Sequence, residues 1–252
     1  PYLDQSTPGV LQQGNSNLVS EKNHSFALTY NFFAAKFSTS WTLRHSFTNN
    51  SIESVTTLVN DNDISGVKNP TGKMVNYGTY YNIGKTQTTS LSGYISWMIF
   101  KNTRLYMNAW VDYSDYNDRL SLHNYGWYGS LYMNLEQTLP KDWQISAGFS
   151  GWTSNPGLQS KSQGNNYYSL SLRKSMLNKR LTISLFANNF LQKERRYKNT
   201  RHGSNFTYNS DFYQSAPNFG INLSLRLGEL TSGVKKAMKS IENDDVKSGN
   251  GK

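Results

Sequence analysis

The sequence has no cysteine, only six prolines and no long apolar run among its 252 residues. Without cysteine, disulfide bonds and thiolate metal sites are excluded, and any metal would depend on histidine and carboxylate ligands. No window approaches the roughly eighteen consecutive apolar residues that a membrane helix needs. If the chain crosses a bilayer, it must therefore do so with paired strands, because only these and helices satisfy the backbone in lipid.

Acidic residues are also scarce. The chain carries 26 Lys and Arg against 16 Asp and Glu, a net charge of +10. The basic residues are scattered, apart from Lys193–Arg196 and the C-terminal tail, and scattered charge is typical of solvated loops rather than a binding stripe. We therefore expect no nucleic-acid partner.

Aromatic and small polar residues are abundant. Seventeen Tyr, six Trp and twelve Phe occur with many Ser, Thr, Asn and Gly, as in a β-rich protein with one wet face. The clearest segment has Phe219, Ile221, Leu223, Leu225 and Leu227 on one side and Gly220, Asn222, Ser224 and Arg226 on the other. This period of two predicts a strand between an apolar and a polar environment.

The same alternation recurs along the chain and predicts about nine strands, most of them long enough to cross hydrocarbon when tilted. They are Ser25–Phe33, Phe37–Thr48, Leu91–Phe100, Arg104–Tyr113, Tyr125–Leu139, Trp143–Trp152, Tyr167–Met176, Leu181–Phe190 and Phe219–Leu227. We expect Ile52–Asn60 and Met74–Asn82 to extend the second and third strands, joined by the polar loop Asp61–Lys73.

The connections alternate between short and long. The short ones are Ala34–Lys36, Lys101–Thr103, Pro140–Asp142 and Asn178–Arg180, and the long ones are Asn49–Ser90, Ser114–Asn124, Thr153–Asn166 and Gln192–Asn218. This order is typical of outer-membrane barrels, which have short periplasmic turns and long extracellular loops. The fold class predicted is all-β: a partial, antiparallel transmembrane β-barrel of meandering strands with a short C-terminal tail, located in the cell outer membrane.

Two further patterns agree with a barrel wall. Trp97, Phe100, Trp143, Trp127 and Phe37 lie near segment ends, like the aromatic girdle at a lipid interface. Tyr106, Asn108, Trp110 and Asp112 alternate with apolar residues and predict a polar lumen surface with aromatic side chains, continued by Ser92, Ser96, Thr182, Ser184, Ser169, Ser171 and Arg173. Such a lumen suits water, a plug domain or sugar-like solutes.

Catalytic and metal motifs find little support. The four histidines, His24, His45, His123 and His202, are far apart in sequence and show no metal-binding or acid–base spacing. Asp61-Asn62-Asp63 followed by Gly66 resembles the start of a calcium loop, but the later ligands are missing. We expect no enzyme activity, no cofactor and no metal site.

Two clusters are candidate binding sites. Carboxylates and aromatic rings gather at the outer end of the fourth strand, in Trp110, Asp112, Tyr113, Asp115, Tyr116 and Asp118. They suit sugar hydroxyls or Ca²⁺, the alternative being a solvated acidic rim. Lys193, Arg195, Arg196 and Lys198 suit the phosphates of lipopolysaccharide, the alternative being ordinary loop charges.

Short passages resemble TonB-dependent receptors. Pro1–Ser6 leading to Gly14–Glu21 resembles the passage "GNPxLxPE" of their barrels, with Ser16 and Ser20 in place of its two prolines. Ile52–Val55, and Leu225–Gly228 followed by a Lys-rich tail with Asn243-Asp244-Asp245, are further matches. Together they resemble the C-terminal barrel region of TonB-dependent receptor-like outer-membrane β-barrel proteins of Bacteroidota.

This resemblance implies a division of the chain and a function. Residues 1–228 would be the C-terminal part of a barrel of about twenty-two strands, and residues 229–252 a basic periplasmic tail, either a short helix or disordered. The whole protein would take up a solute, energised by TonB through a plug outside this chain, with a surface lipoprotein as a further partner. The alternatives are a non-transporting barrel that anchors an adhesin or assembly complex, and a soluble glycan-binding β-protein.

Overall fold

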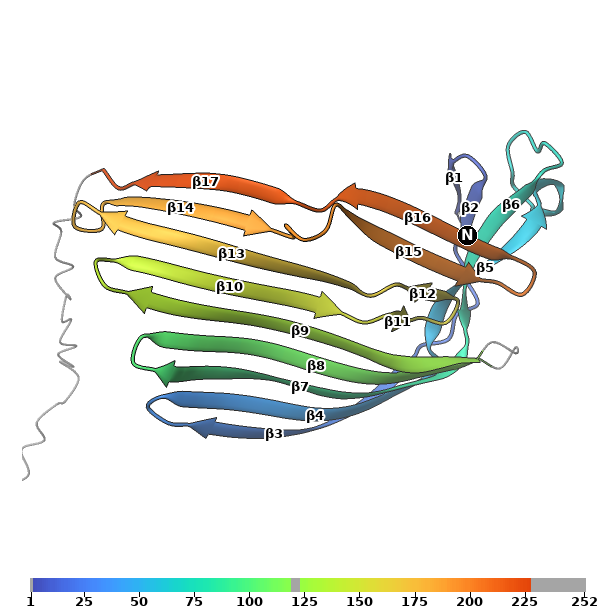
Figure 1. Cartoon of the computed structure of the whole chain (residues 1–252). Coiled ribbons are helices and arrows are strands. Elements are labelled where there is room, and N and C mark those ends of the chain that lie inside the picture. Colours follow the sequence, from blue (N-terminus) through green and yellow to red (C-terminus); the bar gives the residue numbers. More distant parts are fainter. Residues whose placement is uncertain (1, 119–122, 228–252) are drawn as a thin grey trace, which may run out of the picture.

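A computed structural model describes residues 2–118 and 123–227 of the chain (Figure 1). Within these ranges the only helical element is the 3-10 turn η1 (Asp61–Asp63), and the other regular elements are strands. No helix in the described ranges is long and apolar enough to span a membrane. The all-β prediction is confirmed for this part of the chain, whereas the predicted tail at 229–252 lies outside the described residues.

The largest element is a nine-stranded antiparallel sheet with the order β17-β14-β13-β10-β9-β8-β7-β4-β3. Its strands are β3 (Lys22–Phe33), β4 (Phe37–Asn49), β7 (Gly84–Phe100), β8 (Thr103–Asp118), β9 (His123–Leu139), β10 (Trp143–Trp152), β13 (Asn165–Met176), β14 (Leu181–Asn188) and β17 (Asn218–Leu225). All nine predicted strands are present and meander in the predicted order. β7 and β8 are longer than predicted, because their outer ends pair with each other. These ends are polar, so the sequence does not mark them as strand.

The register divides every strand of this sheet between two faces. Leu43 pairs with Leu91, Leu91 with Val111, and Ile183 with Leu223, so these apolar side chains share one face, which we call the apolar face. Ser40, Tyr94, Asn108 and Tyr132 pair in one line across the other, which we call the polar face. The apolar face is open to its surroundings, with Leu28 73%, Ile221 74% and Leu223 65% exposed. Two stacked sheets would have buried these side chains.

Tight turns close one end of the sheet, on the left of Figure 1. Ala34 and Phe37 exchange backbone hydrogen bonds of 2.7 and 3.3 Å across the first turn. Lys141 and Asp142 have φ of 60° and 57° after Pro140, as type I′ hairpin turns require, since their twist matches that of the flanking strands. The four predicted short turns therefore lie together at one end.

The opposite end carries two smaller sheets, which we call the outer sheets. The first has the order β1-β2-β6-β5, with β1 (Leu3–Thr7), β2 (Val10–Gln13), β5 (Ile52–Asn60) and β6 (Met74–Asn82). The second has the order β11-β12-β15-β16, with β11 (Asn155–Pro156), β12 (Ser160–Ser162), β15 (Glu194–His202) and β16 (Thr207–Ser215). The segments Thr153–Asn166 and Gln192–Asn218, which we expected to be loops, therefore contain paired strands. The sequence does not indicate these strands, because the segments are polar on both sides.

Compact junctions connect the large sheet to the outer sheets. Ile83 donates a backbone hydrogen bond to Ser51 (2.8 Å) and Ser51 one to Gly84 (3.3 Å), so the β4–β7 ladder runs on into β5 and β6. Gly84 has φ of 114°, which L side chains rarely adopt. At the other junction Asn189 is 1% exposed, and its Oδ1 accepts from the Tyr168 N–H at 3.1 Å. β5 and β6 thus extend the predicted strands, but turn into a separate sheet.

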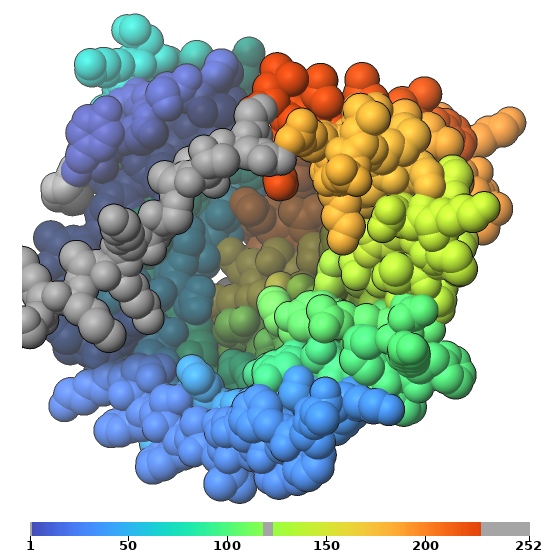
Figure 2. Space-filling view, turned by 90° about the vertical axis from the view of Figure 1, so that its left-hand side faces the viewer, coloured from blue at the N-terminus to red at the C-terminus, as the bar shows by residue number. Residues whose placement is uncertain are grey.

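The large sheet is open at both edges. β3 and β17 each pair with one neighbour and not with each other, although the sheet curves around a central hollow when viewed from the turn end (Figure 2). A curved, open wall is therefore what the described residues form, and closure into a barrel stays a prediction.

Candidate solute-binding face

The polar face is organised as rows of side chains that run across the strands at one height. One row contains Ser40, Tyr94, Asn108, Tyr132, Ser150 and Tyr167 on successive strands. The next row outward contains Thr42, Ser92, Trp110, Ser130, Trp152 and Asn165. In both rows, a small polar residue lies between most neighbouring aromatic residues. The aromatic side chains are therefore flanked by hydroxyl and amide groups on this face.

A hollow of about 500 Å³ lies over these two rows. It is lined by Ser40, Thr42, Ser92, Gly93, Tyr94, Asn108, Ala109, Trp110, Ser130 and Tyr132, none of them charged. This volume is in the range of small-molecule sites, which are about 300–1,000 Å³. The sequence-predicted lumen residues Asn108 and Trp110 thus lie in the wall of one cavity, and Tyr106 adjoins it, its ring centroid 6.2 Å from that of Tyr132.

Polar groups in this hollow have capacity left for a ligand. The Tyr106 hydroxyl donates to Asn108 Oδ1 at 3.3 Å, which leaves the Asn108 amide N–H groups. Within the described ranges, no residue hydrogen-bonds the Tyr94 or Tyr132 hydroxyl or the Trp110 indole N–H. These groups are donors and acceptors without formal charge, so the cavity suits a neutral polar ligand.

Charged side chains lie above and below this neutral region on the same face. On the outer side, Arg44 and Asp112 share a row with Ser90 and Tyr128. On the turn side, Arg104 pairs with Glu136, and both line a second cavity of about 280 Å³ together with Lys101. The polar face is therefore layered, with a neutral aromatic band between two rows of mixed charge.

The predicted cluster on β8 is divided by the strand. Trp110, Asp112 and Tyr116 belong to the polar face, while Tyr113 pairs with Trp127 and Asp115 with Tyr125 on the apolar-face side. Asp115 accepts a hydrogen bond from His123 Nε2 at 2.9 Å. Asp118 pairs with Gly84 at the end of the strand. The other five residues therefore do not converge on one site, because β8 continues through a segment expected to be a loop, and ligand binding by the cluster stays a prediction.

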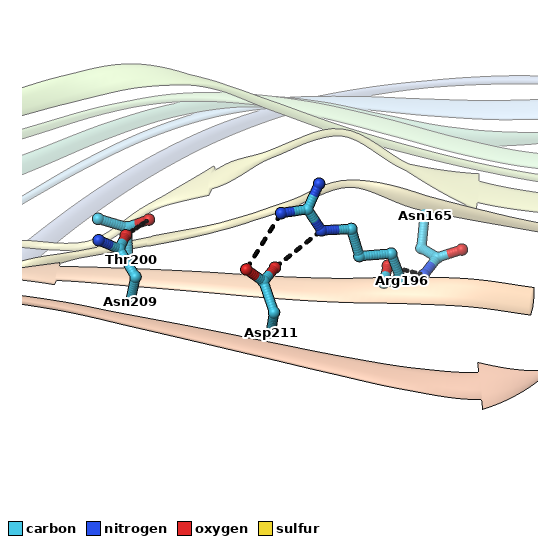
Figure 3. Close-up of polar contacts among 5 residues, drawn as sticks. All are labelled: Asn165, Arg196, Thr200, Asn209 and Asp211. Carbon is cyan, nitrogen blue, oxygen red and sulfur yellow. Dashed lines mark hydrogen bonds and ion pairs between the residues drawn. The ribbon is translucent and has the colours of Figure 1, made fainter.

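The predicted lipopolysaccharide cluster lies at β15, where its members have different partners. Arg196 donates to both carboxylate oxygens of Asp211 at 2.8 and 3.1 Å (Figure 3). This hydrogen-bonded arginine holds the pKa of Asp211 below its usual value. The Arg195 guanidinium lies 5.5 Å from the ring centroids of Tyr167 and Tyr197. Two of the four cations are thus engaged within the protein, and binding of lipid phosphates by Lys193, Arg195, Arg196 and Lys198 stays a prediction.

The residues of the incomplete calcium loop organise their own backbone. Asp61 is 5% exposed and accepts hydrogen bonds from the Thr71 N–H and hydroxyl (2.7 and 2.8 Å) and from the Gly72 N–H (2.7 Å). The Thr71 N–H contributes most to lowering the pKa of this carboxyl. The Asp61 carboxylate therefore closes the loop between η1 and β6.

A contact between the outer sheets was not predicted. β5 is an edge strand, and two side-chain amides from turns of the other outer sheet bond to its backbone. Gln159 Oε1 accepts from the Thr56 N–H (2.8 Å) and its Nε2 donates to the Thr56 carbonyl (3.2 Å). Asn205 bonds to the Leu58 N–H and carbonyl in the same way, at 3.1 and 2.6 Å. We call this contact the amide clamp; isolated Gln and Asn residues give no sequence signal for it.

The amide clamp borders a cavity of about 250 Å³ between the outer sheets. Its lining includes Glu53, Tyr116, Leu158, Gln159 and Arg201. Glu53 is half-buried there, and burial raises the pKa of its carboxyl above the ordinary 4.5. The lining is mainly polar, and it comes from both outer sheets and β8.

An antiparallel sheet with an exposed apolar face, a polar face and turns at one end has the features of a membrane β-barrel wall. The model of the outer membrane protein beta-barrel family matches residues 1–225. The chain belongs to this family, and its location is the outer membrane. Comparisons with curated proteins and with solved structures found no match.

Proposed function

We propose that the chain forms part of the wall of a TonB-dependent receptor-like transporter that takes up a solute across the outer membrane. The observation that carries this proposal is the neutral cavity on the polar face, on the side of the sheet opposite the apolar surface. A wall that only anchors the protein in lipid needs no such cavity. The coupling to TonB and the plug are supported by the resemblance of the sequence passages.

In this proposal the two regions have different roles. The outer sheets meet the solute first, and the aromatic band of the polar face lines part of its path through the membrane. The rows of charge on either side of that band, at Arg44 and Asp112 and at Arg104 and Glu136, favour neutral or zwitterionic solutes over strongly charged ones, since mixed charge attracts neither sign over distance.

Depletion of solutes from a defined medium tests the proposal. Cells that express the intact protein are compared with cells that lack it, and mass spectrometry follows the medium. At least one solute should disappear from the medium more slowly when the protein is absent. In cells that contain the protein, collapse of the inner-membrane proton gradient should slow the uptake of the same solute. Uptake that is the same in both strains would contradict the proposal.

A non-transporting anchor is the second candidate, and one observation favours it. Tyr208, Phe212 and Tyr213 are 54%, 59% and 55% exposed on β16, the edge strand of its outer sheet. Exposed aromatic side chains beside an unpaired strand edge are suited to a surface partner such as an adhesin or a lipoprotein. This candidate predicts loss of a surface protein, with unchanged uptake, when the protein is deleted.

A further inference from the structure

The cavity on the polar face has the chemistry of a carbohydrate site. Its lining combines the rings of Tyr94, Trp110 and Tyr132 with hydroxyl and amide groups and no charge. The C–H groups on one face of a sugar ring carry small positive charges, which attract the negative face of an aromatic ring. The hydroxyl groups of the sugar both donate and accept, as the free polar groups of this cavity require.

Other classes of solute fit the cavity less well. A charged solute would lose its hydration without gaining a counter-ion from the lining, and burying an unpaired charge is strongly unfavourable. An acyl chain would cover the Tyr94 and Tyr132 hydroxyls and the Trp110 N–H without bonding them, and unsatisfied buried groups are also unfavourable. A neutral polyhydroxylated ring avoids both penalties.

The positions of the rings also suit such a ligand. Tyr94 and Tyr132 lie in one row with Asn108 between them, and neighbouring strands are about 4.8 Å apart, so these two tyrosines are rooted about 10 Å apart. Trp110 is in the adjacent row, 44% exposed, with its ring centroid 5.6 Å from that of Tyr128. A sugar lying on Asn108 would therefore meet an aromatic side chain on each side and the indole along the strand.

We propose that the cavity lined by Tyr94, Asn108, Trp110 and Tyr132 binds a neutral saccharide unit on its path through the membrane. The inference rests on the proposed transport function and names its class of solute. Trp110 supplies the stacking surface, and Asn108 and the two tyrosine hydroxyls hold the hydroxyl groups of the ring.

Equilibrium dialysis of the intact protein, reconstituted in lipid vesicles, tests this inference. The probes are radiolabelled maltose, cellobiose and lactose, with glucuronate and glucosamine as charged counterparts. At least one neutral disaccharide should bind saturably and more tightly than both charged sugars. Trp110→Ala should weaken this binding about tenfold, which corresponds to about 1.4 kcal/mol of lost stacking.

Trp127→Ala is the matched control, because Trp127 is 66% exposed on the adjoining strand and pairs with Tyr113 on the apolar-face side. It should leave saccharide binding within about twofold, as expected for a side chain outside the cavity. Tyr132→Phe keeps the ring and removes one hydroxyl, so it should fold normally and weaken binding about threefold to tenfold.

Saturable binding that is lost in Trp110→Ala and kept in Trp127→Ala would support the saccharide site. No saturable binding of any of the three disaccharides by the folded intact protein, or equal losses in the two tryptophan variants, would overturn it. If the cells take up another solute in a proton-gradient-dependent way but the protein binds no saccharide, this inference is refuted alone. The transport proposal then stands.

Discussion

The large sheet and the outer sheets of this protein treat apolar side chains in opposite ways. Among the described residues, the buried apolar side chains of Leu11, Val75, Ile83, Leu158 and Ala216 all belong to the outer sheets or their connections. In the large sheet, by contrast, apolar side chains such as Leu28, Ile221 and Leu223 are largely exposed. The two regions therefore suit different surroundings. Along the large sheet, lipid covers the apolar side chains, whereas the outer sheets bury theirs in a small protein core surrounded by water.

The pairing in the two regions differs as well. Each strand of the large sheet pairs with the next strand of that sheet along the chain, whereas β2 pairs in parallel with β6 across more than sixty residues, and β12 pairs with β15. The amide clamp joins residues 147 positions apart, at Leu58 and Asn205. The outer sheets thus include pairings that skip strands along the chain, while the large sheet pairs its strands in sequence order, across tight turns at one end and long connections at the other.

The largest expected effect comes from placing a charge on the apolar face. Ile221→Arg should destabilise the protein in lipid vesicles by about 2–4 kcal/mol, because arginine must leave water for hydrocarbon. Ile221 lies in the middle of β17 and pairs with Leu185 on that face, whereas its neighbour Asn222 pairs with Ser184 on the polar face. Asn222→Arg is therefore the matched control and should be mild. Equal destabilisation of both variants, measured by urea unfolding in vesicles, would contradict the assignment of the apolar face to lipid and the polar face to water.

A smaller effect is expected at the amide clamp. Gln159→Leu leaves the Thr56 N–H and carbonyl without these partners and should destabilise the outer sheets by about 1–3 kcal/mol. Hydrogen exchange should show faster exchange at β5 and unchanged protection in the middle of β8 and β9. Gln163→Leu is the control, since Gln163 follows β12 outside the clamp. Faster exchange throughout the large sheet would show that the two regions unfold together.

The smallest effect concerns the pH dependence of the outer sheets. Because burial raises the pKa of Glu53, its protonated form favours folding at low pH. That contribution is complete below the ordinary pKa of 4.5, and it is lost as the pH rises through the higher folded value. Glu53→Gln should therefore raise the melting temperature at pH 7 and leave it unchanged at pH 4. An equal shift at both pH values would indicate a contact unrelated to ionisation.

Much of the large sheet could be predicted because its signal is local. Trp143–Trp152 has the predicted bounds, and Phe219–Leu227 differs from the observed strand by one or two residues at each end. Contact with lipid on one side and water on the other imposes a period of two that is visible within ten residues. The same period correctly predicts that Asn108, Trp110 and Asp112 share the polar face of β8.

The outer sheets and the sites could be predicted only in part. The segments at β15 and β16 are polar on both sides, so their alternation is weak and they resemble loops. The predicted site on β8 combined Tyr113 and Asp115 with Asp112, since a loop, unlike a strand, would let neighbours converge. Arg196 was expected to be available to phosphate, and its pairing with Asp211 depends on the register of β15 and β16.

The sequence by itself determined the all-β class, the strands of the wall and the face that each side chain occupies, because these follow from alternation between neighbours. The tertiary structure alone decided which polar segments pair into outer sheets, that Gln159 and Asn205 bond to the edge of β5, and that Tyr94, Trp110 and Tyr132 line one cavity. Such features depend on the register and curvature of strands distant in sequence, and no local pattern encodes these.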